Sequence, residues 1–306
     1  MPRVLVGVPY VGQVAGAFYQ SVVGLLQEHH RKTLDLDVVA VPNAAVHLAR
    51  DMLVRHFLRG GHDYLVMIDS DQVFHPDCVP RLVSWAVPYV SAMIVTRVGK
   101  PVPVAYAYER FEDGPDGGKH YYAPLSEEVW AYLSQYDPAD WRLPGATGVL
   151  SRNPPHEPRM GDIPDEVRRG LDTALLACDG VGTGMVCLSQ ECAQRLDPGP
   201  GDRYFDWEHG GEDLSFSRRI LKAGYTGFDP AFLDGHYTAG ERREPGIFMD
   251  RGCLVGHLTY YARGPVDLEH YLRSGRFQTT DADAEGAQAL AAELEAEEAA
   301  VQEALR

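Results

Sequence analysis

The sequence lacks a long apolar run, a cysteine framework and an excess of basic residues. No stretch of about 18 consecutive apolar residues occurs, which argues against a transmembrane helix. The first residues, MPRVLVGVPY, run into a strand pattern rather than the apolar segment of a secretory signal. The five cysteines are odd in number and form no CxxC pair, which argues against a disulfide framework and predicts free buried thiols. We therefore expect a cytoplasmic protein without membrane insertion.

Basic residues are scarce: 28 Lys and Arg stand against 44 Asp and Glu, for a net charge of -16. Binding to duplex DNA is driven largely by Lys and Arg that displace counterions, so this balance disfavours a general binder of nucleic-acid backbones. A local basic patch stays open. The residues that would form it are Arg218, Arg219, Lys222, Arg242 and Arg243.

Strand and helix patterns alternate along the first third of the chain. Continuous apolar runs, typical of buried parallel strands, occur at residues 3–8, 36–41, 63–68 and 89–95. Helical patterns separate them, at residues 16–30, 43–59 and 76–86. This rhythm predicts an α/β fold with a Rossmann-like, mostly parallel central sheet.

The rest of the chain divides into an insertion, a second ordered part and an acidic tail. Residues 101–178 are rich in tyrosine and proline, and the GPDGG stretch within them predicts a hairpin. Strand and helix patterns resume at residue 179. We expect one catalytic domain over residues 1–280. An Ala/Glu-rich C-terminal helix at 281–306 would either pack on this domain or join subunits into a homo-oligomer.

Two carboxylates follow directly after the third strand pattern, in Asp69-Ser70-Asp71. Ligands in open α/β sheets bind at the carboxyl ends of strands. Two acids at such an end can both turn toward one hard cation. The pattern predicts a Mn²⁺ or Mg²⁺ site that bridges a donor diphosphate and neutralises charge on the leaving phosphate. Without this context, the tripeptide also fits a solvated turn or a helix cap.

Glu212 and Asp213 open a later helical pattern. Acids at a helix N-terminus are favourable caps, and the functional alternative is a base that takes a proton from an acceptor hydroxyl. Two histidines, His236 and His257, lie near expected strand ends. Either imidazole could complete a metal shell, or it could be a hydrogen-bonded structural residue.

In this order, the motifs resemble nucleotide-sugar glycosyltransferases of the A-type fold, in the inverting family-2 style found in phage and bacterial genomes. The matching segments are VGVPY, HLARDMLVRHFL, YLVMIDSDQVFHPD, GVGTGMVCLSQECAQRL, GGEDLSFSRRILKAGY and GHLTYY. They cover residues 3–96 and 179–261. Residues 101–178 have no counterpart, and acceptor specificity usually resides in such variable segments.

The resemblance implies a role for each matching residue. Asp69 and Asp71 would hold metal and donor, with Asp71 favoured as the direct ligand, and Asp213 would be the base with Glu212 beside it. His257 is preferred as third metal ligand, because CLVGHL has the apolar run and glycine that the family shows. The remaining candidates are Pro9, Tyr10, Arg50, Ser70 and His236 for the donor, and Gly182, Thr183 and Gly184 for the acceptor side.

The expected reaction moves a sugar from a nucleotide-sugar, UDP-sugar by default, to an acceptor hydroxyl. The acceptor stays open between a glycan or small molecule, a protein and a modified nucleic-acid base. A nucleotidyltransferase is the first alternative, but it normally has a basic Gly-rich loop after the first strand, and here no Lys or Arg follows that strand before Arg31. A non-catalytic sugar- or nucleotide-binding module is the second, and it would need no Asp213.

Overall fold

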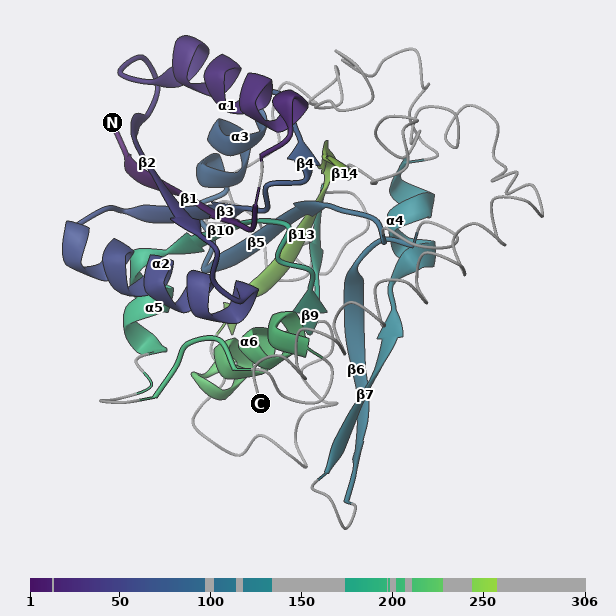
Figure 1. Ribbon diagram of the computed structural model, residues 1–306. Helices are drawn as coiled ribbons and strands as arrows, with labels where there is room; N and C mark the ends of the chain where they lie inside the picture. Colours follow the sequence, from purple (N-terminus) through teal and green to yellow (C-terminus); the bar gives the residue numbers. More distant parts are fainter. Residues whose placement is uncertain are drawn as a thin grey trace.

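The computed structural model describes residues 1–12, 14–96, 102–113, 118–133, 174–196, 198, 202–206, 211–227 and 244–257. A seven-stranded sheet forms the centre of the molecule (Figure 1). Its strands are, in spatial order, β2 (Asp35–Pro42), β1 (Arg3–Tyr10), β3 (Tyr64–Ile68), β10 (Met185–Ser189), β5 (Tyr89–Met93), β13 (Ile247–Leu254) and β8 (Leu175–Ala177).

Most strands of this sheet run in one direction. β1 pairs in parallel with β2 and β3, and β13 pairs in parallel with β5. β10 is antiparallel to both β3 and β5, so these two neighbours point the same way, and β8 is antiparallel to β13. The expected α/β fold with a mostly parallel sheet is confirmed. No sequence pattern indicated the reversed β10, because a buried strand is a continuous apolar run in either direction.

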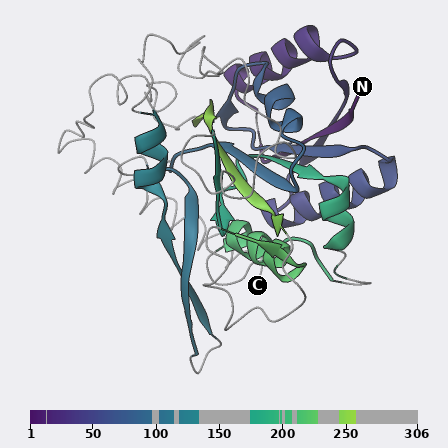
Figure 2. The same cartoon turned by 180° about the vertical axis from the view of Figure 1, so that it is seen from behind.

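Helices cover both faces of the sheet, as Figures 1 and 2 show from opposite sides. On one face lie α1 (Gly16–His29) and α3 (Cys78–Ser84). On the other lie α2 (Val46–Gly60), α5 (Gln190–Arg195) and α6 (Gly211–Lys222). Within the described ranges, no helix is long and apolar enough to cross a membrane.

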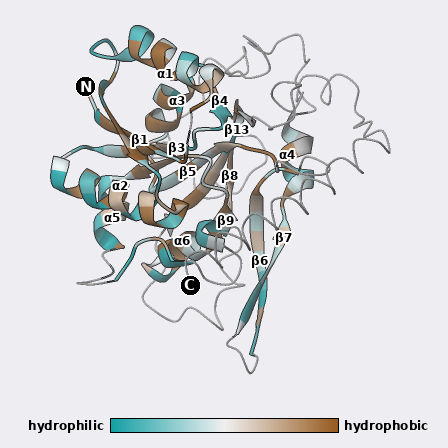
Figure 3. Cartoon of the chain, viewed as in Figure 1, coloured by the Kyte–Doolittle hydropathy of each residue, from teal (hydrophilic) through white to brown (hydrophobic). Residues whose placement is uncertain are grey.

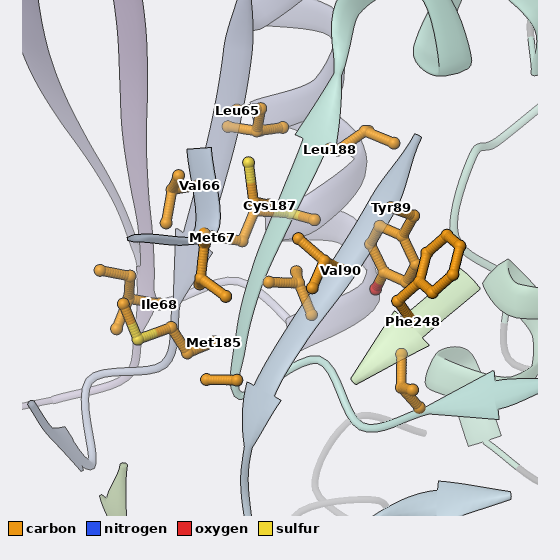
Figure 4. Close-up of a cluster of buried hydrophobic side chains, with 14 of the residues drawn as sticks. Leu65, Val66, Met67, Ile68, Tyr89, Val90, Met185, Cys187, Leu188 and Phe248 are labelled. Atoms are coloured by element: carbon orange, nitrogen blue, oxygen red, sulfur yellow. The ribbon is translucent and has the colours of Figure 1, made fainter. Parts of the chain in front are cut away.

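The apolar side chains of the strands form the core between these layers. Figure 3 shows the apolar colour concentrated on the sheet, and Figure 4 shows labelled side chains of β3, β10, β5 and β13 packed together. Leu65, Val66, Met67 and Ile68 of β3 are all 0% exposed. Each such burial contributes about 1.5–3 kcal/mol, so this cluster fixes the position of the residues that follow β3. The five cysteines are free and buried, as predicted.

The insertion contributes a hairpin of β6 (Ala105–Glu112) and β7 (Lys119–Pro124), which confirms the prediction around GPDGG. It projects away from the main sheet in Figure 1. The hairpin also pairs with β9 (Gly180–Val181), and α4 (Ser126–Leu133) follows it. The expected C-terminal helix at 281–306 lies outside the described residues, and the domain division stays a prediction.

Two short ladders complete the structure. β11 (Tyr225–Thr226) pairs with β12 (Glu244–Pro245) after α6. β4 (Gln72–Val73) pairs antiparallel with β14 (Gly256–His257). β4 directly follows the Asp-Ser-Asp motif in the sequence, so this ladder brings β14 beside the candidate site.

Candidate active site

A buried arginine joins the two acidic motifs of the sequence. Arg50 of α2 is 2% exposed. Its Nη2 donates to both carboxylate oxygens of Asp69, at 2.8 and 2.9 Å. Its Nη1 donates to Glu212 at 2.7 Å and to Asp213 at 3.0 Å. The segment after β3 and the first turn of α6 therefore meet around one guanidinium.

The position of Asp69 follows from the pairing of β3 with β10. Ile68 lies opposite Met185, and one step further the Asp69 N–H donates to the carbonyl of Gly184 at 2.8 Å. A Cβ on Gly184 would lie 2.9 Å from Nε2 of Gln72, so glycine at this position lets the Gln72 side chain lie close to the backbone. The buried strand pair thus delivers the acid to the carboxyl end of β3, as expected for a ligand site in an open sheet.

The position of Asp213 follows from the start of α6. Gly211 begins the helix with a φ of 87°, a left-handed conformation that glycine adopts without strain. Thr183 is fully buried, and its hydroxyl donates to Oδ1 of Asp213. Together with Arg50, this bond holds the Asp213 carboxylate in one orientation.

Acids outnumber the guanidinium at this centre, because Asp71 adds a further carboxylate to the three that Arg50 binds. Burial raises the pKa of Asp69 to about 6; Arg50 opposes this, while Asp71 and Asp213 add to it. Burial also raises the pKa of Glu212, with Asp213 adding to the effect. Burial would lower the pKa of Arg50, but Asp69, Asp213 and Glu212 together raise it. The centre carries an excess of negative charge that a further cation would neutralise.

The raised pKa of Asp69 gives a stability prediction for the protein in EDTA. The usual value is 3.8 and the folded value about 6, so the folded state binds this proton more tightly. The contribution of protonated Asp69 to the free energy of unfolding should therefore fall as the pH rises from about 4 to about 6, and then level off. Urea unfolding at pH 4.5, 5.5 and 6.5 should show the free energy of unfolding of the wild type falling, relative to that of Asp69→Asn, as the pH rises. A difference independent of pH would contradict the prediction.

The backbone of His257 lies beside the Asp-Ser-Asp motif. In the β4–β14 ladder, His257 is opposite Gln72. The side chain of Gln72 in turn donates from Nε2 to Oδ1 of Asp71 at 3.3 Å. The side chain of His257 lies outside the described part of the chain, as does all of His236, so their roles as ligands stay predictions.

The other predicted residues divide between the edge of the sheet and its interior. Pro9 and Tyr10 end β1, and because Gly7 lies opposite Met67 in the parallel pair, they reach the same edge as Asp69. Ser70 is half-buried between the two aspartates. The contacts of Arg50 are with carboxylates, and its low exposure leaves little surface for a nucleotide. Its contact with the donor stays a prediction.

The predicted acceptor-side residues are largely internal. Gly182 and Thr183 are buried, and a Cβ on Gly182 would lie 2.8 Å from the side chain of Val104. Close packing therefore accounts for the glycine without a substrate. Thr183 reaches the site through Asp213, and the expected contact with an acceptor stays a prediction.

Two buried polar residues at the centre were not predicted. Gln72 is 0% exposed, and its Oε1 has no hydrogen-bond partner among the described residues. The hydroxyl of Tyr89 is in the same situation, and burial, followed by Asp213, raises its pKa well above the usual value. Tyrosine is common in strands, so Tyr89 carried no signal. For Gln72, the only signal in the sequence is its position next to Asp71.

The oxygen-rich donor set fits a hard cation. Mn²⁺ and Mg²⁺ prefer carboxylate and amide oxygens. Asp71 supplies a carboxylate, and Gln72 adds a buried amide oxygen without a partner among the described residues. Both oxygens of Asp69 are bound by Arg50, so Asp71 is the better placed of the two for direct contact with an ion.

No protein-family model matches the chain, and no curated protein matches it. Among solved structures, it is similar to A197 from STIV, with a TM-score of 0.41, 11% identity, and coverage of 84% of this chain and 86% of that one. It is also similar to the mannosyltransferase PcManGT from Pyrobaculum calidifontis, in complex with GDP-Man and Mn²⁺, with a TM-score of 0.38, 13% identity, and coverage of 98% and 80%. Likenesses of this size do not decide the function, which has to be argued from the site.

Proposed function

We propose that the chain is a metal-dependent glycosyltransferase that moves a sugar from a nucleotide-sugar to an acceptor hydroxyl. The observation that carries this proposal is the gathering of Asp69, Glu212 and Asp213 around Arg50 at the carboxyl end of β3. The sequence resemblance implies the same two motifs for the metal, the donor and the base. The mixed sheet with helices on both faces supports it as well, because such sheets bind ligands at this edge.

Asp213 is the proposed base. Its bonds to Arg50 and Thr183 both use Oδ1, and no described residue bonds Oδ2. Its side chain is 34% exposed, against 13% for Glu212, so an acceptor reaches Asp213 more readily. Oδ2 takes the proton of the acceptor hydroxyl while the hydroxyl oxygen forms a bond to the anomeric carbon of the donor. The bond from that carbon to the donor phosphate breaks, and a single displacement inverts the centre.

The donor is proposed to lie along the edge formed by the ends of β1 and β3. Asp71 would hold Mn²⁺ or Mg²⁺ directly, with Asp69 beside it and His257 as the proposed third ligand. A cation bound there would neutralise charge on the departing diphosphate. Pro9 and Tyr10 would contact the nucleotide, which is UDP by resemblance.

Thermal unfolding with UDP-, GDP-, dTDP- and CMP-sugars, each with Mn²⁺ and with EDTA, tests this proposal. We expect one nucleotide-sugar to raise the Tm only with Mn²⁺, because a ligand that binds the folded state stabilises it by about 2.7 kcal/mol at a hundred times its Kd. Asp71→Asn should abolish the shift. Asp113→Asn, at an exposed aspartate after β6, is the matched control and should keep it.

Two results would count against the proposal in different ways. If no nucleotide-sugar shifts the Tm under either condition, the acidic cluster is structural and the transferase assignment fails. If one donor binds with metal but releases no nucleotide, either to glycan, protein or nucleic-acid acceptors or by slow hydrolysis with water, the chain is a binding module.

A further inference from the structure

A second cluster of metal-ligating side chains lies between the end of α1 and the segment after β4. Glu28 and His29 belong to the last turn of α1, and Asp77 immediately precedes α3. One ligand atom from each lies within 4.8 Å of the others. His75 lies beside them, with Nδ1 3.4 Å from Oδ2 of Asp77. None of these residues belongs to the site described above.

We propose that Glu28, His29 and Asp77 form a second cation site, which takes Zn²⁺ or a similar ion that favours imidazole. Nε2 of His29 is 3.0 Å from Oδ1 of Asp77. Tetrahedral zinc with bonds of about 2.0–2.2 Å places two ligand atoms about 3.4 Å apart. Nε2 of His29 and Oδ1 of Asp77 therefore need to move apart only slightly to admit the ion. Imidazole with carboxylate suits zinc, whereas the oxygen-rich set near Asp71 suits Mn²⁺ or Mg²⁺.

The second nitrogen of His29 is held in the manner of a metal-ligating histidine. Nδ1 lies 3.0 Å from the hydroxyl oxygen of Thr33. Metal-bound histidines almost always use their other ring nitrogen in such a bond, which fixes the ring and its tautomer. With the proton on Nδ1 and donated to Thr33, Nε2 would present its lone pair to an ion held beside the Asp77 carboxylate.

The surroundings favour a bound cation further. The side chains of His29 and His75 are 13% and 16% exposed, so competition from water is reduced. The cluster lies at the C-terminal end of α1, where the helix dipole attracts positive charge. The segment after β4, which carries His75 and Asp77, is also bonded to α1: the N–H of Phe74 donates to the hydroxyl of Ser21 at 3.1 Å. The ion would therefore anchor the chain that leads away from the Asp-Ser-Asp motif without touching reacting groups.

Zn²⁺ binding to the full chain, stripped with EDTA and dialysed, tests the site by calorimetry. We expect one high-affinity Zn²⁺ and a higher Tm, both retained in Asp71→Asn. His29→Gln, Asp77→Asn and Glu28→Gln should each weaken binding about tenfold or more. Glu28 is exposed, so that variant keeps its packing and stays informative if another fails to fold. His56→Gln, at an exposed histidine of α2, is the matched control.

Three results would overturn the inference. The wild type could bind no Zn²⁺ at micromolar concentration. The three cluster variants could bind it as the wild type does. Binding could instead be lost in Asp71→Asn, which would assign the ion to the candidate active site. Since Mn²⁺-dependent donor binding is measured separately, this inference and the transferase proposal can fail independently.

Discussion

Asp213→Asn is expected to lower sugar transfer by about 10²–10⁴-fold while donor binding is retained, because a positioned general base contributes a factor of this size. The amide oxygen can still accept from Arg50 and Thr183, so the start of α6 keeps its bonds. What is lost is the ability to take the acceptor proton. The rate of nucleoside diphosphate release and the donor-induced Tm shift, measured on the same preparation, separate these two effects.

Glu212→Gln is the matched control for this substitution. The two acids are adjacent and bind the same nitrogen of Arg50, so each variant removes one negative charge from the same cluster. Because the side chain of Glu212 is less exposed, we expect a much smaller loss of turnover. Equal losses would contradict the assignment of Asp213 as base, and a larger loss in Glu212→Gln would reverse the two roles.

The sequence predicted the strands and helices of the first third because their apolar periodicity reports burial directly. The runs at 3–8 and 63–68 became β1 and β3, and the helix at 43–59 became α2, which ends before Gly61 in a left-handed conformation. Periodicity does not report which strands are neighbours. The insertion of β10 between β3 and β5 therefore appeared only in the structure.

The two acidic motifs were also predicted, but the link between them was not. Arg50 lies in an amphipathic helix, where a charged residue usually faces solvent. Its partners Glu212 and Asp213 lie 162 and 163 positions away, and no local pattern reports contacts at such separation. The resemblance suggested a nucleotide contact for this arginine, whereas its described bonds are with acids.

No sequence pattern indicates the His29–Asp77 cluster, for a related reason. His29 ends a helix and Asp77 starts one, 48 positions later, so each side chain alone has an ordinary structural explanation. The sequence indicated a metal site only beside Asp69 and Asp71, where two acids directly follow a buried strand. Ligands from separate elements become visible as a set only once α1 and the segment after β4 are packed together.

Arg50→Met is expected to destabilise the protein by about 3–5 kcal/mol at pH 7 in EDTA, because it leaves buried carboxylates without their cation. Asp69, Glu212 and Asp213 would then lie together without the guanidinium that neutralises them and donates hydrogen bonds to them. Urea unfolding measures the loss. Arg50→Lys should recover only part of it, since a lysine ammonium cannot reproduce a planar fork that binds several carboxylates.

Arg59→Met, at an exposed arginine in the last turn of the same helix, is the control and should change stability by no more than about 0.5 kcal/mol. Mn²⁺ supplies the discriminating result. If Arg50 neutralises the acids that also hold the metal, the ion should stabilise Arg50→Met more than the wild type, because it replaces part of the missing positive charge. Equal stabilisation of both proteins would mean that the arginine and the ion act on separate groups. A loss in Arg50→Met as small as in Arg59→Met would mean that the ionic cluster does not hold α2, β3 and α6 together.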